Sequence, residues 1–270
     1  MPDILDKIFC EKKVELDTVK CKLPLPDVKI LIANNNYKIR DAKTFLKQNE
    51  LSSIIAEIKP RTPFKGTLLK KNDPVDIAKT YADNGASALS ILTESRYFGG
   101  SLLTLEKARE YVDIPLLRKD FIFDEYQVYE ARAFGADFFL LIATWLDKNQ
   151  LADLLALGRE LGLSALIETH NENDMEKAFE VGASIIGINN RDLTSGKTDL
   201  SIARRLIPMA LQIPDNLLVC ESGIRSRSDI EEFQNLGAHS FLIGESLMTA
   251  ENIGNKLREF TGDRKISTTN

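Results

Sequence analysis

The segment Gly85-Ala86-Ser87-Ala88-Leu89-Ser90-Ile91-Leu92 joins a Gly-Ala pair to a short apolar run. The preceding residues, 74–84, have helical spacing and carry proline at the first turn, where a helix tolerates it. Glycine suits the left-handed position just past a helix C-terminus, and a short apolar run is typical of a buried strand. The segment therefore predicts a helix, a tight turn and a strand, in that order.

The same junction recurs along the chain. Gly-Ala pairs lie at residues 85–86, 135–136, 182–183 and 237–238, separated by 50, 47 and 55 residues. Each pair ends a predicted helix and precedes a predicted strand, and each separation corresponds to about two strand–helix units. Gly162 occupies the same kind of position before another strand. This regularity indicates a repeated βα architecture.

Eight apolar runs alternate with amphipathic segments after residue 51. The predicted strands are 54–58, 88–92, 115–117, 138–142, 165–167, 185–188, 217–220 and 241–243. Eight βα units fit either a doubly wound sheet or a closed barrel, and their count and near-equal spacing favour the barrel. A dinucleotide-binding sheet would carry a Gly-rich loop after its first strand, but this chain has Lys59-Pro60-Arg61-Thr62-Pro63 there. We predict an α/β fold, a (βα)8 TIM barrel with a helical N-terminal extension.

The domain boundaries follow from the same pattern. Residues 1–48 contain helical spacing without strand signals, interrupted by Leu23-Pro24-Leu25-Pro26, which breaks any helix. We expect this extension to pack on the barrel, residues 49–260. The remaining residues, 261–270, are polar and have little to bury, so we expect a disordered tail.

Composition narrows the class of partner. The formal net charge is −5 and the pI is about 5.3, which argues against nucleic acid, because phosphate backbones favour a basic face. A small anionic ligand held by a few local cations remains compatible with this charge. The longest apolar run, 138–146, is too short to span a bilayer. We therefore expect a small-molecule substrate and no contact with a membrane.

Cysteine and histidine usage points to a reducing compartment and away from a metal site. Cys10, Cys21 and Cys220 are odd in number and lack metal-ligand spacing. His170 and His239 are the two histidines of the sequence, too few for a His-rich metal site. The first residues carry charges of both signs and no apolar signal-peptide region. We expect a cytoplasmic protein without a metal.

Polar residues follow nearly every predicted strand. In a barrel of this kind the chemistry lies where strands end and βα loops begin. A single such residue is best explained as a solvated strand end, but so many at one mouth indicate a binding or catalytic site. The strand-end residues are Glu57, Lys59, Thr93, Glu94, Arg118, Lys119, Asp120, Glu168, Asn189, Arg191, Glu221, Ser222, Gly244, Glu245 and Ser246.

Two parts of this site can be separated. Ser222-Gly223 and Gly244-Glu245-Ser246 follow the seventh and eighth strands, where barrels bind phosphate through backbone N–H groups. Arg191 and the loop after Lys59 would add cationic contacts. Two ordinary left-handed turns are the alternative explanation for these glycines.

The second part is a set of interleaved lysines and carboxylates. Glu57 and Lys59 project from the same face of the first strand, either as a structural ion pair or as part of a site. Such a set can have shifted pKa values and exchange protons with a substrate. We infer acid–base chemistry without a cofactor on a phosphorylated metabolite. We place His170 in the loop beyond this set and His239 at the opposite strand end. The set comprises Glu57, Lys59, Lys119, Glu168, Asn189 and Glu221.

These residues lie in motifs that resemble a known family. AEIKPRTPFKG (56–66), YFGGSL (97–102), LLRKDFI (116–122), ALIETH (165–170), IGINNRDL (186–193), ESGI (221–224) and FLIGESLM (241–248) occur in order, each at or just after a strand end. Together they resemble the indole-3-glycerol-phosphate synthase family of tryptophan biosynthesis, over the whole chain to about residue 260. The resemblance implies decarboxylation and dehydration of 1-(2-carboxyphenylamino)-1-deoxyribulose 5-phosphate, giving indole-3-glycerol phosphate. It implies no cofactor and leaves contact with other enzymes of the pathway open.

The resemblance also implies roles for individual residues. Lys119 resembles the general acid that assists attack of the ring carbon on the ketone, and Glu168 resembles the second acid–base group, which assists loss of the hydroxyl. Lys59 is similar to the lysine that contacts the substrate carboxylate and assists proton transfer. Glu57 and Asn189 match residues that orient these groups.

The remaining matches complete the implied site. Glu221 and Ser222 close the wall beside the acid–base groups. The implied phosphate contacts are Thr62, Arg191, Gly223, Gly244 and the backbone N–H of Glu245. The loop after Lys59 departs from the family pattern, which has serines around its proline, because Phe64 replaces a hydroxyl with a bulky ring.

Two other functions are compatible with the residues. One is a sugar-phosphate lyase of the Schiff-base aldolase type, with Lys119 or Lys59 as nucleophile. The other is a barrel that binds a phosphorylated metabolite without chemistry.

Overall fold

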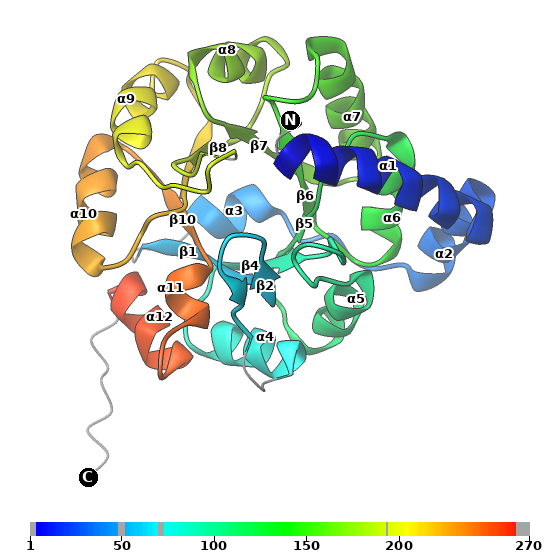
Figure 1. Ribbon diagram of the computed structural model, residues 1–270, viewed down its shortest axis with the longest axis horizontal. Helices are drawn as coiled ribbons and strands as arrows, with labels where there is room; N and C mark the ends of the chain where they lie inside the picture. The colour runs from blue at the N-terminus through cyan, green and yellow to red at the C-terminus, as the bar shows by residue number, and fades with distance from the viewer. Residues whose placement is uncertain (1–3, 48–51, 70–72, 193, 263–270) are drawn as a thin grey trace.

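Eight parallel strands close into a barrel at the centre of the computed structural model, which describes residues 4–47, 52–69, 73–192 and 194–262 (Figure 1). The strand order around the barrel is β1-β10-β9-β8-β7-β6-β5-β4. The predicted (βα)8 barrel is thus confirmed. Its strands are β1 (Ser53–Ile58), β4 (Ala88–Leu92), β5 (Leu116–Lys119), β6 (Phe138–Ile142), β7 (Ser164–Thr169), β8 (Ile185–Asn189), β9 (Leu217–Glu221) and β10 (Ser240–Ile243).

The strands read as continuous apolar runs because both of their faces are buried. Alternate residues of β1 show the two environments. Ile54 and Ala56 pack outward against the helices. Ile55 packs inward with residues of the other strands, such as Leu117 and Leu166. The inner residues fill the barrel below its mouth.

Eight helices form the outer ring and follow the strands in turn. The four helices that precede the Gly-Ala pairs end there, as predicted. The glycine of each pair has a positive φ, between 70° and 111°, which suits the position just past a helix C-terminus. Asp124 and Ser226 begin two helices with complete capping boxes. The ring consists of α4 (Pro74–Asp83), α5 (Leu102–Tyr111), α6 (Glu125–Ala133), α7 (Lys148–Glu160), α8 (Glu172–Glu180), α9 (Ser201–Ala210), α10 (Arg227–Leu236) and α12 (Ile253–Thr261).

Three helices precede the barrel strands. α1 (Ile4–Lys22) begins at the rim of the barrel near β6 and β7 and runs outward past α6 and α7 (Figure 1). α2 (Leu25–Asn35) packs on α6. α3 (Ala42–Lys47) contacts β1, β4 and β9 at the opposite end, where the carbonyl of Leu46 accepts a hydrogen bond from the Ser53 hydroxyl at 2.8 Å. The N-terminal segment therefore contacts both ends of the barrel.

Two small elements were not predicted from the sequence. A hairpin of β2 (Arg61–Thr62) and β3 (Gly66–Thr67) follows β1 and lies over the barrel mouth (Figure 1). Arg61 ties it to the loop after β4, since its N–H donates to the Phe98 carbonyl at 3.1 Å. A one-turn helix, α11 (Glu245–Met248), follows β10. Both elements border the site described below.

The predicted boundary at residues 48–49 and residues 263–270 of the predicted tail lie outside the described residues. Within the described ones, Thr261 is buried as the last residue of α12. No helix in this part of the chain is long and apolar enough to cross a membrane.

Candidate active site

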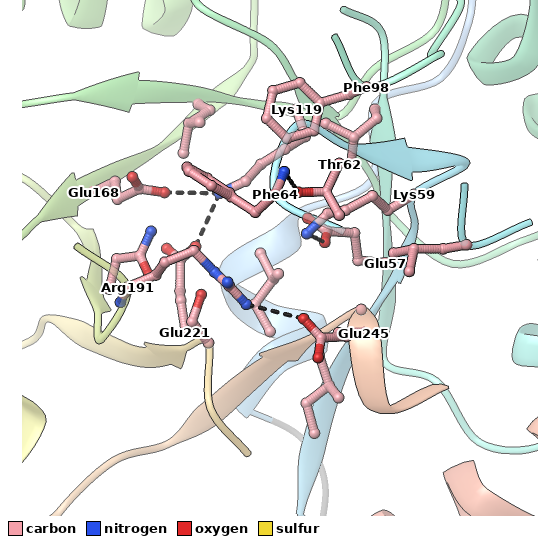
Figure 2. A pocket seen from close by; sticks show the side chains of 18 of the residues that line it. Glu57, Lys59, Thr62, Phe64, Phe98, Lys119, Glu168, Arg191, Glu221 and Glu245 are labelled. Carbon is pink, nitrogen blue, oxygen red and sulfur yellow. Dashed lines mark hydrogen bonds and ion pairs between the residues drawn. The ribbon is translucent and has the colours of Figure 1, made fainter. Parts of the chain in front are cut away.

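A cavity opens at the carboxyl ends of the strands (Figure 2), and the residues predicted for the acid–base set and the phosphate set lie along it, whereas the strand-end residues Thr93, Glu94 and Arg118 do not. The acid–base set and the phosphate set are neighbours there, on one continuous wall. The predicted residues lining the cavity are Glu57, Lys59, Thr62, Lys119, Glu168, Asn189, Arg191, Glu221, Ser222, Gly223, Gly244 and Glu245.

Strand alternation explains why these side chains converge. Side chains two residues apart in a strand point to the same face. Glu57 follows Ile55 by two residues, Lys119 follows Leu117, and Glu168 follows Leu166. Each of these apolar residues belongs to the cluster inside the barrel, so the charged residue after it points into the barrel mouth.

Lys119 lies at the centre of the charged set. Its Nζ is 2.8 Å from Glu168 Oε2 and 2.9 Å from Glu221 Oε2, and Figure 2 shows both carboxyl groups directed at the ammonium. The side chains of Glu168 and Glu221 are 3% and 1% exposed, so the three groups interact with little screening by water.

The two carboxyl groups are shifted in opposite directions. Burial raises the pKa of Glu221. Lys119 lowers it, but the charge of Glu168 adds to the effect of burial, so the pKa stays above its ordinary value. Burial would also raise the pKa of Glu168, but Lys119 and His170 outweigh it and the pKa falls below its ordinary value. The site therefore places a carboxyl group whose ionised form is favoured, Glu168, beside one whose protonated form is favoured, Glu221.

Lys119 is held as a cation. Burial disfavours its ammonium, but the charges of Glu168, Glu221 and Glu57 outweigh burial and raise the pKa of Lys119. A lysine that attacks a carbonyl as a nucleophile must first be neutral. The geometry thus favours Lys119 as a proton donor.

Two glycines make room for the carboxyl groups. A Cβ on Gly187 would lie 2.1 Å from Glu221 Oε1, and one on Gly244 would lie 2.3 Å from Glu57 Oε1. Glu57 in turn forms an ion pair with Lys59. Any larger residue at these positions would displace a carboxyl group of the site.

Asn189 links the acid–base set to the phosphate set. Its side-chain oxygen accepts from the backbone N–H of Arg191 at 3.0 Å, and its side chain hydrogen-bonds to Glu168. Arg191 extends towards α11, where its guanidinium is 3.2 Å from Glu245 Oε2. Lys65, from the hairpin, also pairs with the Glu245 carboxylate. The sequence analysis did not include Lys65, because nothing local relates it to residue 245.

The backbone beside Glu245 suits an anion. Ser222 and Gly223 have φ values of 64° and 85°, and successive N–H groups in such conformations form concave anion-binding turns. Gly223 packs closely against Thr198 and Leu200, whose side chains leave no room for a Cβ. Together with Gly244, these residues surround one end of the cavity, which the side chains of Arg191 and Lys65 enter. We call this end the phosphate corner, after its predicted ligand.

The hairpin covers part of this corner. Phe64 at its turn packs on the loop after β8, where a Cβ on Gly196 would lie 2.6 Å from the phenyl ring. Thr62 and Phe64 both line the cavity. The bulky ring that distinguishes this loop therefore contacts a glycine across the cavity mouth.

An apolar side of the cavity was also missed by the sequence analysis. Phe98 and Phe121 face each other with ring centroids 6.1 Å apart, and Leu140 and Ile8 line the cavity near them. The inward position of Leu140 could have been read from strand alternation, two residues after Phe138. Ile8, from α1, has no such local signal. This side suits a planar aromatic group next to the charged set.

His170 was placed outside the acid–base set, but the structure brings its ring against Glu168. Its Nε2 is 3.4 Å from Glu168 Oε1, while its Nδ1 is 3.2 Å from the Thr144 hydroxyl. The second histidine, His239, lies at the opposite strand end, as expected, where its Nδ1 accepts the backbone N–H of Leu218 at 3.1 Å.

A buried ion-pair network anchors α1 beside Lys119. Lys12 Nζ is 3.2 Å from Asp120 Oδ1, and Arg118 lies between Asp120 and Glu130, 2.6 Å from the latter. Arg118 and Asp120 flank Lys119 in sequence. Arg118 points to α6, where it contacts Gln127 and Glu130, whereas Asp120 lies at the cavity wall and faces Lys12. The N-terminal helix is thus fixed to the strand that carries Lys119.

Among the residues that the structure describes, no cluster of His, Cys, Asp and Glu side chains is placed to hold a metal ion.

Comparison with known proteins gives a consistent match. The family model for indole-3-glycerol phosphate synthase matches residues 5–260. An indole-3-glycerol phosphate synthase from Roseiflexus sp. (strain RS-1) is 45% identical over 268 residues, covering 97% of this chain and 99% of that protein. One from Campylobacter jejuni (strain 81-176) is 46% identical over 257 residues, covering 94% and 98%.

Solved structures share the barrel at low identity. The 3-hexulose-6-phosphate synthase of Salmonella typhimurium superposes with a TM-score of 0.62 at 12% identity, covering 78% of this chain and 97% of that chain. A thiamine phosphate pyrophosphorylase from Pyrococcus furiosus gives 0.56 at 17% identity, covering 78% and 94%. These likenesses concern the fold alone.

Proposed function

The chain belongs to the indole-3-glycerol phosphate synthase family, and from that premise we propose how the residues of its cavity carry out the family's reaction. The enzyme is a carboxy-lyase of tryptophan biosynthesis. It converts 1-(2-carboxyphenylamino)-1-deoxyribulose 5-phosphate into indole-3-glycerol phosphate, carbon dioxide and water. The observation that best supports the assignment of roles is the Lys119 ammonium between two carboxyl groups whose pKa values are shifted apart.

Lys119 is the general acid of ring closure. As the ring carbon bonds to the ketone carbon, the carbonyl electron pair moves to the oxygen, which takes a proton from the Lys119 ammonium. The bond to the carboxylate then breaks, carbon dioxide leaves, and the electron pair restores the aromatic ring. The raised pKa of Lys119 supports this role, because the group is protonated when substrate binds.

Glu168 is the base of dehydration. Its lowered pKa keeps it a carboxylate, able to take the proton from the carbon beside the nitrogen as the new double bond forms. The hydroxyl leaves as water with a proton from Lys59, which also contacts the substrate carboxylate. In each turnover Lys119 and Lys59 each give one proton to the substrate, and Glu168 takes one proton from it.

Four further residues orient these groups. Glu57 pairs with Lys59, and Asn189 hydrogen-bonds to Glu168. Glu221 also holds the Lys119 ammonium, and Ser222 continues that wall. Their roles depend on burial, which prevents water from replacing the hydrogen bonds.

The substrate phosphate binds at the other end of the cavity. Arg191 supplies a cation and Thr62 a hydroxyl, while Gly223, Gly244 and Glu245 supply backbone N–H groups. The Glu245 carboxylate now pairs with Arg191, so a bound phosphate would compete with it for the same cation.

The wider assignments are also proposals. We treat residues 1–48 as an extension of one barrel domain, 49–260, with a polar tail at 261–270. Ile8 on the cavity and Lys12 paired with Asp120 support a part for the extension in the site. A cytoplasmic location is supported by the three free thiols, Cys10, Cys21 and Cys220.

The test is turnover of the carboxyphenylamino deoxyribulose phosphate, followed by indole fluorescence. We expect Lys119→Ala and Glu168→Gln each to lower kcat by ~10²–10⁴-fold, the usual contribution of an acid–base group. Lys107→Ala, on the exposed face of α5, is the matched control and should keep the wild-type rate.

The alternatives make different predictions. Borohydride would trap a covalent substrate adduct if a lysine acted as a nucleophile, as in an aldolase. A folded wild-type protein that binds the substrate without forming an indole would contradict the proposed reaction. Near-normal turnover in Lys119→Ala or Glu168→Gln would remove that residue from its role.

A further inference from the structure

His170 lies directly after β7, with its ring between the protein surface and Glu168. The Nε2 atom is buried 3.4 Å from Glu168 Oε1, and the Nδ1 atom is 3.2 Å from the hydroxyl of Thr144. Thr144 is exposed, whereas Glu168 is buried. The ring thus connects a surface residue to the base of the site.

The position of one ring proton follows from Thr144. The Thr144 hydroxyl is 2.6 Å from Asp174 Oδ2, and the same oxygen accepts from the His170 backbone N–H and from Asn171, both at 3.1 Å. Asp174 is an acceptor in all three contacts, so the single hydroxyl proton of Thr144 points to it. The Thr144 oxygen must then accept from His170, which places a proton on Nδ1.

The second ring nitrogen decides the charge of His170. In a neutral ring with its proton on Nδ1, the lone pair of Nε2 would face the Glu168 carboxylate and repel it. No hydrogen-bond partner of Nε2 is present among the described residues. A proton on Nε2 turns the repulsion into an ion pair with Glu168 at 3.4 Å. The geometry therefore fits an imidazolium whose Nδ1–H donates to Thr144 and whose Nε2 side pairs with the Glu168 carboxylate.

We propose that His170, as an imidazolium, is a positioning residue for Glu168, holding Oε1 while Lys119 holds Oε2. The inference rests on the role proposed above for Glu168. With one cation at each oxygen, the carboxylate stays ionised and has a fixed orientation when it takes the substrate proton. Loss of the His170 charge would free one side of the base without removing it.

The surroundings of the ring stabilise the charged form. Glu168 faces it from β7, Asp174 from α8, and Asp192 interacts with it from the loop after β8. The cation of α8 near this loop, Lys177, donates to backbone carbonyls of the loop after β6. Three carboxylates therefore surround the ring, so an imidazolium at this position is attracted from each of these elements.

The test compares kcat and KM for the wild type, His170→Ala and His170→Gln. We expect His170→Ala to lower kcat about 10–100-fold, the value of one polar interaction with a charged group, with KM changed less than twofold. His170→Gln can donate an amide N–H to Glu168, so it should recover part of kcat. His239→Gln removes the other histidine, far from the cavity, and should keep the wild-type kcat and KM.

The outcomes separate this inference from the proposed function. Wild-type kcat in His170→Ala, or a lowered kcat that His170→Gln does not recover in part, would overturn the role of His170. In the Glu168→Gln background, His170→Ala should cause no further loss, and a full additional loss would show that His170 does not act through Glu168. A normal rate in Glu168→Gln alone would instead reject the proposed base.

Discussion

Replacing Gly187 by alanine tests the geometry around Lys119 without removing any functional group. Gly187 lies on β8 behind the Glu221 carboxyl group. A Cβ there would be 2.1 Å from Glu221 Oε1, whereas ordinary contacts begin at 3.4 Å. Because Glu221 Oε1 is buried, the carboxyl group must retreat by roughly 1 Å, and its 2.9 Å contact with Lys119 would be lost or distorted.

The expected effect on rate can be worked from that displacement. A shift of about 1 Å at an active site can cost ~100-fold in rate, which is ~2.7 kcal/mol on the barrier. The added methyl group would also overpack the barrel interior, at ~1–3 kcal/mol of stability. We therefore expect kcat of Gly187→Ala to fall about 100-fold in a protein that still unfolds cooperatively, with Tm lowered by several degrees.

The assay is indole fluorescence at saturating substrate, with thermal unfolding measured in parallel. Gly254→Ala, in α12, where a Cβ would lie 3.0 Å from the Asn84 side chain, is the matched control and should keep its rate because the site is outside the cavity. In the Glu221→Ala background Gly187→Ala should be silent, because the atom that it strikes is absent. A kcat within twofold of wild type, or an equal loss in the Glu221→Ala background, would refute the reasoning.

Two further predictions concern the phosphate corner and the N-terminal helix. Glu245→Gln should lower the inhibition constant of inorganic phosphate several-fold, because the carboxylate now pairs with Arg191 and Lys65 and repels the anion; an unchanged or higher constant would argue against phosphate binding there. Lys12→Met should lower Tm by several degrees, since it removes a cation from the buried Asp120. The pKa of Asp120 is lowered despite its burial, chiefly by Lys12. The ion pair between Lys12 and Asp120 therefore stabilises the fold above the ordinary ionisation range of aspartate, and this stabilisation is lost as the pH falls. The difference in Tm between the wild type and Lys12→Met should thus shrink in acid, and a constant difference would count against the ion pair.

Local chemistry explains why so much of the barrel was predictable. A glycine with positive φ is needed where a helix ends and the chain turns into a strand, so Gly85 and Gly237 carry that requirement in the sequence. Strand alternation then fixes which side chains face inward. Lys119 and Glu168 were predicted because each lies at the end of an apolar strand, and in the structure each follows an inward apolar residue by two positions.

Contacts between distant segments explain what was missed. Local spacing placed His170 in the loop after the strand but could not show which group its ring contacts. In the structure Thr144, from the loop after β6, and Asp174, from α8, orient the ring towards Glu168. Lys65 meets Glu245 from across the cavity mouth. Such pairings depend on tertiary distances, and the residue types alone do not encode them.

The pairing of β1 with β10, in which Ser53 lies opposite Ser240, has a consequence for synthesis of the chain. The first and last strands of the barrel are neighbours, so the growing polypeptide cannot close the barrel until β10 has emerged from the ribosome. Until then β1 and β9 each keep one unpaired edge, which is a template for aggregation. Gly244 and Glu245 follow β10 directly, so the proposed phosphate corner is completed by the same late event. A nascent chain stalled before β10 would therefore have both open edges and an incomplete site.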